Sequence, residues 1–194
     1  MSNTREKILK IALTLFSKKG YLGATTREIA QKAGITEVTL FRYFPNKETL
    51  FKEVINTYSF LPKLKIILDE SEIKNKSVEE ILKNIAYNFL ETLEEKKDLI
   101  NIMHLEIQRY PQKVKKIFEA IIESTLDLIS SYFEKMQQKK IFKKISPQIA
   151  ARAFLGMIYS YFYAKEIIKY SENFSKKEII ENYINIYLNG ILKK

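Results

Sequence analysis

The sequence predicts an all-α protein with about nine helices and no sheet. Apolar residues recur at helical spacing along almost the whole chain, and no stretch alternates convincingly between apolar and polar residues. Only five glycines and four prolines occur in 194 residues, which is too few for a turn-rich β fold. The length allows a substantial core, because a chain of this size buries about 70% of its extended surface.

Composition excludes several kinds of site. The chain has no cysteine and one histidine, which excludes a disulfide scaffold, a zinc finger and cysteine nucleophile chemistry. We also expect no metal, because the carboxylate pairs Glu79-Glu80 and Glu94-Glu95 are typical of solvated helix ends, and no cofactor. A catalytic serine triad would need His104, and no signature around it supports one, so we expect no enzyme. The net charge of +10 suits a polyanionic partner, either nucleic acid or an acidic membrane surface.

No segment predicts export or insertion into a membrane. The N-terminal residues carry a charge every few positions, and the longest apolar stretch, Ala153 to Ala164, is too short to span a bilayer. We therefore expect a cytoplasmic protein without a membrane partner. A basic helix on a membrane surface is disfavoured, since the N-terminal basic residues surround a helix-turn-helix pattern instead of lining one polar face.

Local signals set the predicted helix boundaries. Gly20 and Gly34 are expected to end the first two helices, because glycine readily adopts the left-handed conformation. Pro62 should kink or end a fourth helix that runs from Lys47 towards Phe60. Capping residues are expected at the start of the other helices, namely Thr25, Thr36, Asn46, Ser77, Ser146 and Ser175, with Pro111 in the first turn of a further one.

Residues 25–51 predict a helix-turn-helix. Ala30 is small enough for two helices to cross closely, Gly34 permits the turn, and Leu40 faces inward with Ile29. The outer face of the third helix then carries Arg42, which can bind a guanine edge. Residues 1–60 hold ten basic and five acidic side chains, which makes positive charge about twice as dense there as in the remainder.

Residues 4–54 resemble the TetR family of one-component transcriptional repressors. The resemblance is carried by the Gly20-Tyr21 pair, by T-T-x-x-I-A-x-x-A-G-I-T and by T-L-F-R-Y-F-P-N-K-E-T-L. Val38 and Phe41 depart from the family pattern, in which a small residue and a tyrosine are more frequent. The resemblance implies a transcriptional regulator that binds a palindromic operator in double-stranded DNA. The residues that would contact this operator are Thr26, Arg27, Thr36, Thr39, Arg42, Tyr43 and Lys47.

The resemblance also implies two domains. We expect a DNA-binding domain at residues 1–50, joined by the helix at 47–60 to an effector-binding and dimerisation domain at 51–194. The effector would be a small apolar or aromatic molecule; control by a protein partner is the alternative. Residues of this kind are more often ordinary core than ligand lining, and a single histidine is more often structural or on the surface. The candidate pocket residues are Phe89, Met103, His104, Phe118, Ile122, Met157 and Tyr161.

The last two predicted helices favour a homodimer. Apolar residues surround the helix from Ala150 to Tyr163, and a helix that is apolar on every face must be covered on every face. Gly156 would allow a partner helix to approach closely; the alternative is that both helices are the central core of one chain. The interface predicted on the first interpretation comprises Phe154, Ile158, Phe162, Tyr183, Ile184, Tyr187 and Ile191.

Overall fold

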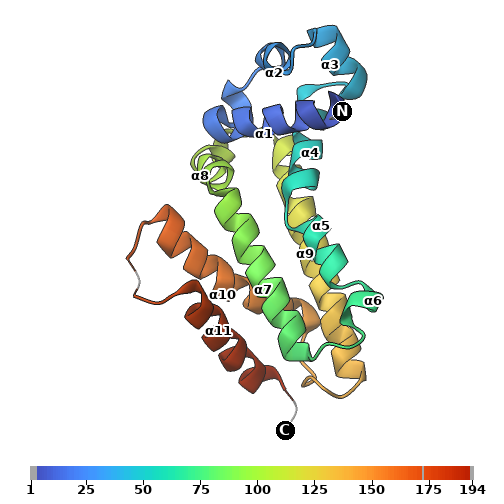
Figure 1. Ribbon diagram of the computed structural model, residues 1–194, viewed down its shortest axis with the longest axis vertical. Coiled ribbons are helices and arrows are strands. Elements are labelled where there is room, and N and C mark those ends of the chain that lie inside the picture. Colours follow the sequence, from blue (N-terminus) through green and yellow to red (C-terminus); the bar gives the residue numbers. More distant parts are fainter. Residues whose placement is uncertain (1–3, 172, 193–194) are drawn as a thin grey trace. The chain divides into compact units, whose positions relative to one another are not determined.

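The computed structural model describes residues 4–171 and 173–192, and this part of the chain contains helices without a strand (Figure 1). The predicted all-α class is therefore confirmed. A single isolated bridge pairs Phe142 with Leu192. The α-helices are α1 Thr4–Gly23, α2 Thr26–Ala33, α3 Glu37–Tyr43, α4 Lys47–Tyr58, α5 Leu61–Ile67, α6 Glu70–Ile73, α7 Val78–Glu95, α8 Lys97–Glu106, α9 Gln112–Gln138, α10 Pro147–Phe162 and α11 Lys176–Ile191, with a 3-10 turn η1 at Ile107–Arg109 and a π-helical turn η2 at Tyr163–Ile167.

Most helices begin directly after the capping residues that the sequence predicts. Thr25, Thr36 and Asn46 each accept a hydrogen bond from the backbone N–H three residues on, at 3.2, 3.1 and 2.8 Å. Ser77 and Ser175 form complete capping boxes with Glu80 and Glu178. Such bonds satisfy backbone donors that a helix start would otherwise leave unpaired.

Gly34 ends α2 as predicted, whereas Gly20 interrupts α1 without ending it and Pro62 does not end the fourth helix. Gly20 and Gly34 have φ values of 68° and 69°, and Gly20 breaks the regular part of α1. The fourth helix ends at Tyr58, before the proline is reached, so the predicted kink or stop at Pro62 is wrong. Pro62 lies in the first turn of α5, where the missing N–H has no helical partner to lose.

The described chain forms two packing units. The N-terminal unit comprises residues 4–59 and 96–121, and the C-terminal unit comprises residues 60–95, 122–171 and 173–192. The expected domain boundary at residue 50 falls within α4, and all of α4 belongs to the N-terminal unit. This unit also takes in α8, η1 and the first part of α9, a contribution that no feature of the sequence suggested.

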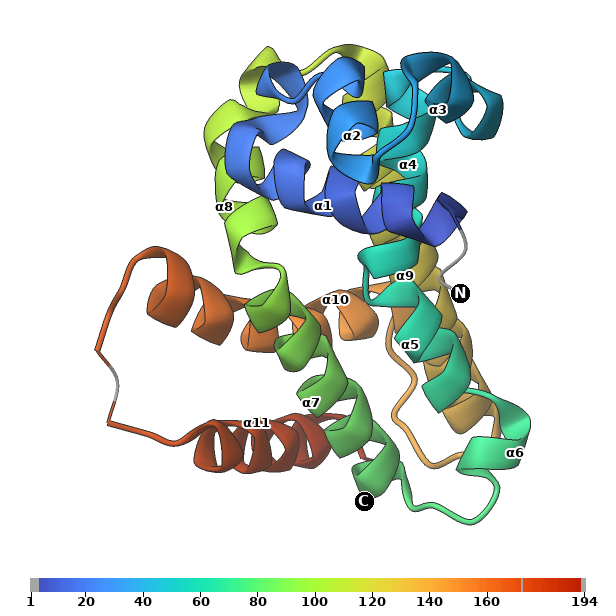
Figure 2. The ribbon, with the colours of Figure 1, turned by 45° about the horizontal axis from the view of Figure 1, so that its top comes forward.

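In the N-terminal unit, α1 packs against α2, α4 and α8, and Figure 2 shows it crossing these helices. The apolar face of α1 supplies Ile8, Ala12 and Phe16, all of which are completely buried. Phe51 from α4 meets the Phe16 ring edge-on, with 4.9 Å between the ring centroids. This packing holds the short helices α2 and α3 on a rigid base.

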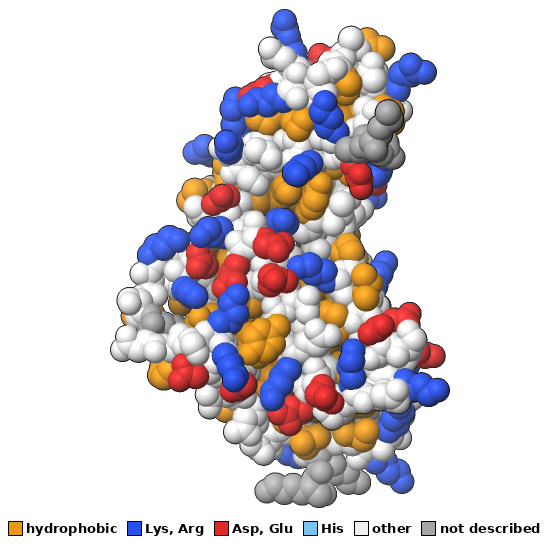
Figure 3. Space-filling view, in the orientation of Figure 1, with side chains coloured by type: hydrophobic (Ala, Val, Ile, Leu, Met, Phe, Trp, Pro, Cys, Tyr) orange, Lys and Arg blue, Asp and Glu red, His pale blue; other side chains and the backbone are white. Residues whose placement is uncertain are grey.

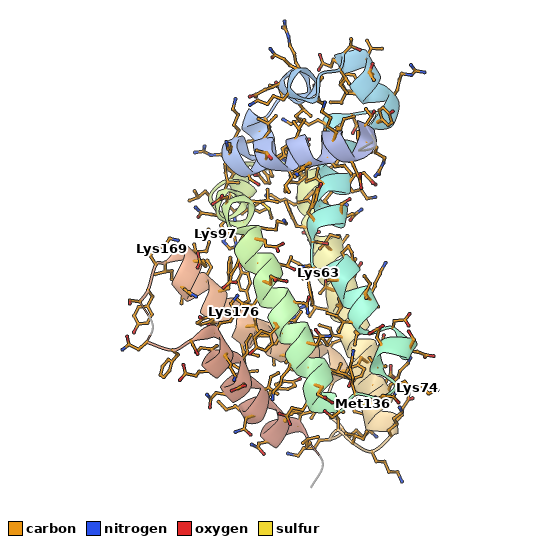
Figure 4. All side chains as sticks on the ribbon, viewed as in Figure 1. Lys63, Lys74, Lys97, Met136, Lys169 and Lys176 are labelled. Carbon is orange, nitrogen blue, oxygen red and sulfur yellow. The ribbon has the colours of Figure 1, made fainter. Side chains whose placement is uncertain are left out.

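In the C-terminal unit, α7 packs against α5, α10 and α11, and α10 also packs against α11 (Figure 2). Phe133 of α9 lies among Phe142, Phe154 and Tyr187, with ring centroids 5.4 to 6.2 Å away. Two lysines border this packing: Lys63 and Lys176, labelled in Figure 4, lie on either side of α7. They bind the carboxylates of two residues of that helix, Glu91 and Glu94.

The residues of the predicted dimer interface lie mostly inside this packing. Their side chains are mostly occupied within one chain: Tyr187 donates its hydroxyl to the Ala150 carbonyl at 2.7 Å, and Tyr183 is half-buried. Side chains already enclosed by their own subunit cannot contact a partner without unfolding. The buried members of that set are Phe154, Ile158, Phe162, Ile184 and Ile191.

Candidate nucleic-acid interface

The turn between α2 and α3 has the predicted helix-turn-helix construction. Ile29, Ala30 and Leu40 are buried where the two helices cross. Gly34 ends α2 in the left-handed conformation, and its N–H bonds the Gln31 carbonyl at 3.1 Å. The small Ala30 and the left-handed glycine together fix α3 against α2.

The outward face of α3 combines apolar surface with one guanidinium group. Val38 is 73% exposed, Phe41 and Tyr43 are exposed by 40% and 43%, and Arg42 is exposed as well. Leu40, on the opposite side, is completely buried. An exposed helix with such side chains can enter a major groove, where arginine binds guanine and apolar groups contact a thymine methyl.

The threonines of the predicted contact set are already engaged in local bonds. The hydroxyls of Thr36 and Thr39 are 2.9 Å apart, and Thr36 also caps α3. Thr26, at the start of α2, donates its hydroxyl hydrogen to a carboxylate oxygen of Glu37. Sequence reasoning missed this role of Glu37, and the spacing of eleven residues between the two partners carries no recognisable signal.

Lys47 begins α4 in a partly enclosed position. Its Nζ lies 4.6 Å from the centre of the Tyr21 ring and donates to the Leu22 carbonyl at 3.5 Å. Burial lowers the pKa of the Lys47 ammonium group from its ordinary value. The ammonium is thus held beside the end of α1, and Arg27, by contrast, is exposed on α2.

The surface of the N-terminal unit is mainly positively charged. Two of the unit's seven glutamates, Glu28 and Glu53, are bound in ion pairs by Lys19 at 2.9 Å and by Arg5. Basic side chains spread over α1 to α3 on the face seen in Figure 3. A surface of this kind attracts the phosphates of a duplex.

The candidate pocket residues are divided between the two units. Met103 and Phe118 pack on the core of the N-terminal unit, where the exposed His104 also lies. Although its side chain reaches the surface, partial desolvation by its neighbours lowers the pKa of His104. The C-terminal unit holds the other four: Phe89 against Phe60 at 5.1 Å, the exposed Ile122, the half-buried Met157 and the buried Tyr161.

Two further polar groups of the C-terminal unit were not predicted. The hydroxyls of Ser130 and Tyr132 are buried and have no hydrogen-bond partner among the described residues. Burial raises the pKa of Tyr132 to about 12. Within residues 4–171 and 173–192, no group of His, Cys, Asp and Glu side chains is arranged to hold a metal ion, and no helix is long and apolar enough to cross a membrane.

The fold and the exposed recognition helix define a helix-turn-helix DNA-binding protein. Residues 8–54 match the family model of bacterial regulatory proteins of the tetR family. Residues 80–189 match the C-terminal domain of AefR-like transcriptional repressors. The chain belongs to the TetR family of DNA-binding transcriptional regulators, as the resemblance implied.

Individual relatives agree with this assignment. The HTH-type transcriptional regulator YvkB of Bacillus subtilis is 32% identical over 162 residues, which cover 84% of this chain and 82% of YvkB. A TetR-family regulator from Mesorhizobium loti superposes with a TM-score of 0.78 at 25% identity, covering 98% and 97% of the two chains. AibR, solved with isovaleryl coenzyme A and operator DNA, shares the fold with a TM-score of 0.64 at 20% identity, covering 95% and 97%.

Proposed function

We propose that the protein is a homodimeric repressor that binds a palindromic operator and is released from it by a small apolar effector. The observation that carries the DNA-binding part is the outward face of α3, where Arg42 stands among exposed apolar side chains. Arg42 would read a guanine edge, and Val38 would contact a neighbouring thymine methyl. The remaining predicted contacts, which would bind phosphate or flank the base-reading side chain, are Thr26, Arg27, Thr36, Thr39, Tyr43 and Lys47.

The proposed dimer uses the outer faces of α10 and α11. Exposed residues recur on α10 every three or four positions at Ile149, Ala153, Gly156 and Ser160, and Tyr163 at the start of η2 continues the series. A Cβ atom added at Gly156 would meet nothing within 4 Å, so a second helix could approach the backbone closely. Exposed positions of α11 form a second stripe, namely Asn182, Ile186 and Asn189.

The proposed dimer surface is tested by a substitution that introduces a negative charge into it. Replacing Ile186 by Asp should yield monomers in analytical ultracentrifugation and weaken operator binding, because both half-sites can no longer be held together. Ile66→Asp is the matched control, since Ile66 is exposed on α5 of the same unit at 67% against 63% for Ile186. A dimer that survives Ile186→Asp would contradict the proposed surface.

The proposed effector site is the interior of the C-terminal unit. Phe89, Met157 and Tyr161 supply apolar surface there, and the buried hydroxyls of Ser130 and Tyr132 could bond a polar group of the effector. AibR supports the idea that one protein of this fold accommodates both an acyl coenzyme A and operator DNA. The pocket candidates Met103, His104 and Phe118 lie in the other unit and have no part in this proposal.

Release by an effector is tested on the operator itself. The operator is first located by footprinting the DNA upstream of the gene and its neighbours. Binding is then titrated with short-chain acyl coenzyme A esters, fatty acids and aromatic acids. We expect one class to release the native protein and to act more weakly on Tyr132→Phe. Release by none of them, together with a response to a cellular protein, would favour the alternative of control by a protein partner.

A further inference from the structure

The Tyr21 ring lies beneath the Lys47 ammonium and has partners on two further elements of the N-terminal unit. The ring centroid is 4.6 Å from Nζ, a distance at which the negative face of the ring attracts a cation. The same ring meets Phe51 of α4 edge-on, with centroids 5.0 Å apart. Tyr21 therefore fixes both the first residue of α4 and its charged group.

Tyr21 is itself held by Tyr110, which lies between η1 and α9 and belongs to the same packing unit. The Tyr110 hydroxyl accepts a hydrogen bond from the Tyr21 backbone N–H at 3.4 Å and donates one to Glu106 at 3.0 Å. The two tyrosine rings meet at 67° with centroids 5.9 Å apart. Burial raises the pKa of Tyr110 to about 12, so the hydroxyl keeps its proton at neutral pH.

Gly20 makes room for this contact. A Cβ atom at position 20 would collide with the Glu106 carboxylate, and φ at this residue is 68°. Glycine is therefore required here for both a left-handed conformation and a close approach. The consequence is that Glu106 and Tyr110 reach the chain at the point where regular α1 ends and Tyr21 begins to face Lys47.

We propose that Tyr110 is a positioning residue for DNA binding, which fixes Tyr21 and thereby the Lys47 ammonium at the start of α4. This inference rests on the proposed phosphate contact of Lys47. An ammonium group held in one place by a fixed ring needs no ordering when the duplex arrives. The segment 96–121 thus serves the DNA-binding surface although it lies far along the chain from the helix-turn-helix motif.

A double-mutant cycle tests the proposal with the full chain and a fluorescent mixed-sequence duplex. Lys47→Met should lower the slope of log affinity against log salt by about 0.9, which is the contribution of one phosphate contact. Tyr110→Phe should weaken binding about three- to tenfold, because two hydrogen bonds that hold Tyr21 are lost. In the Lys47→Met background, Tyr110→Phe should change affinity less than about twofold.

The outcomes separate the inference from the proposed function. An unchanged salt slope for Lys47→Met would overturn the phosphate contact and the inference with it. An equal loss from Tyr110→Phe in both backgrounds, or no loss in either, would overturn the inference alone. If Tyr110→Phe does not fold, Glu106→Gln replaces it in the cycle, since it weakens the bond that orients the Tyr110 hydroxyl.

The chemical shifts of the Lys47 side chain, measured by nuclear magnetic resonance, distinguish a positioning role of Tyr110 from a general loss of stability. In the native protein its methylene signals should show the ring-current shift of Tyr21, and Tyr110→Phe should reduce that shift. Tyr58→Phe is the matched control: Tyr58 lies in the same unit and faces another lysine, Lys96, at 5.5 Å. Lys47 signals that stay unchanged in Tyr110→Phe would overturn the positioning role.

Discussion

The two packing units differ in what their surfaces reveal about function. In the N-terminal unit, α3 places Arg42 outward and Leu40 in the core, as the motif predicts. In the C-terminal unit, the apolar residues predicted to face a partner are buried in their own chain, and the exposed face consists of others, such as Ile149 and Gly156. A motif shared with a family thus predicts which side chains face the binding partner. Apolar periodicity predicts only that a residue is buried, and does not say whether its own chain or a partner buries it.

The largest expected effect tests the assignment of the C-terminal helices to the core. Phe154→Ala should lower the free energy of unfolding by about 3–5 kcal/mol, because a completely buried ring leaves a cavity. Urea denaturation followed by circular dichroism measures this. Ala153→Ser, at an exposed neighbouring position, should change stability by less than about 0.5 kcal/mol. Equal effects would mean that Phe154 is not enclosed by its own chain.

The next effect tests the surface of the N-terminal unit. Arg42→Ala should cost about 1–3 kcal/mol of binding at the operator and relax the preference at one base pair. Lys32→Ala, which removes the same charge from the exposed end of α2, should weaken all sequences alike. Competition between the operator and single-base variants distinguishes the two. An unchanged preference after Arg42→Ala would deny it a role in base recognition.

A pair of buried tyrosines provides a direct comparison of the units. Tyr110→Phe should destabilise the protein by about 0.5–1.5 kcal/mol, since its hydroxyl is hydrogen-bonded. Tyr132→Phe should be neutral or stabilising, since its buried hydroxyl has no partner among the described residues. Thermal unfolding of both variants measures the difference. A larger loss from Tyr132→Phe would show that its hydroxyl is bonded in solution.

The same pair predicts a dependence on alkaline pH. Both folded-state pKa values are raised from 10 to about 12, so with respect to these two phenols the folded state keeps its full stability below pH 10. That stability is lost as the pH rises towards 12, because the unfolded state releases the proton first. Unfolding midpoints measured from pH 9 to 12 should fall less steeply in either phenylalanine variant than in the native protein. Parallel curves would contradict the raised pKa values.

The smallest effect concerns Glu37, the acidic residue of α3. Glu37→Gln should strengthen binding to every duplex by less than about 1 kcal/mol, because it removes a negative charge from the surface that would face phosphate. The glutamine oxygen can still accept the Thr26 hydroxyl, so the local structure is kept. Glu37→Ala removes both the negative charge and the acceptor for the Thr26 hydroxyl, so its comparison with Glu37→Gln separates the two effects. Weaker binding by Glu37→Gln would indicate that the carboxylate itself contacts the operator.

Local signals predicted much of the fold and part of the candidate site. Caps such as Thr36 and Asn46 lie next to the groups they bond, so a few residues of sequence suffice to predict them. The contacts of Tyr110 with Tyr21 and of Thr26 with Glu37 join positions whose proximity depends on tertiary packing. The same holds for the covering of Phe154, which is provided by Phe133 and Tyr187 of other helices.

The measurement that tests the account most directly is selection of bound sequences from random duplexes by the purified full chain at low ionic strength. We predict enrichment of an inverted repeat whose half-sites are about 34–36 Å apart, the spacing of two recognition helices on successive major grooves. Arg42→Ala should recover a repeat that is degenerate at one position of each half-site. Failure of the native chain to enrich any sequence, or enrichment of a site without two-fold symmetry, would contradict the account.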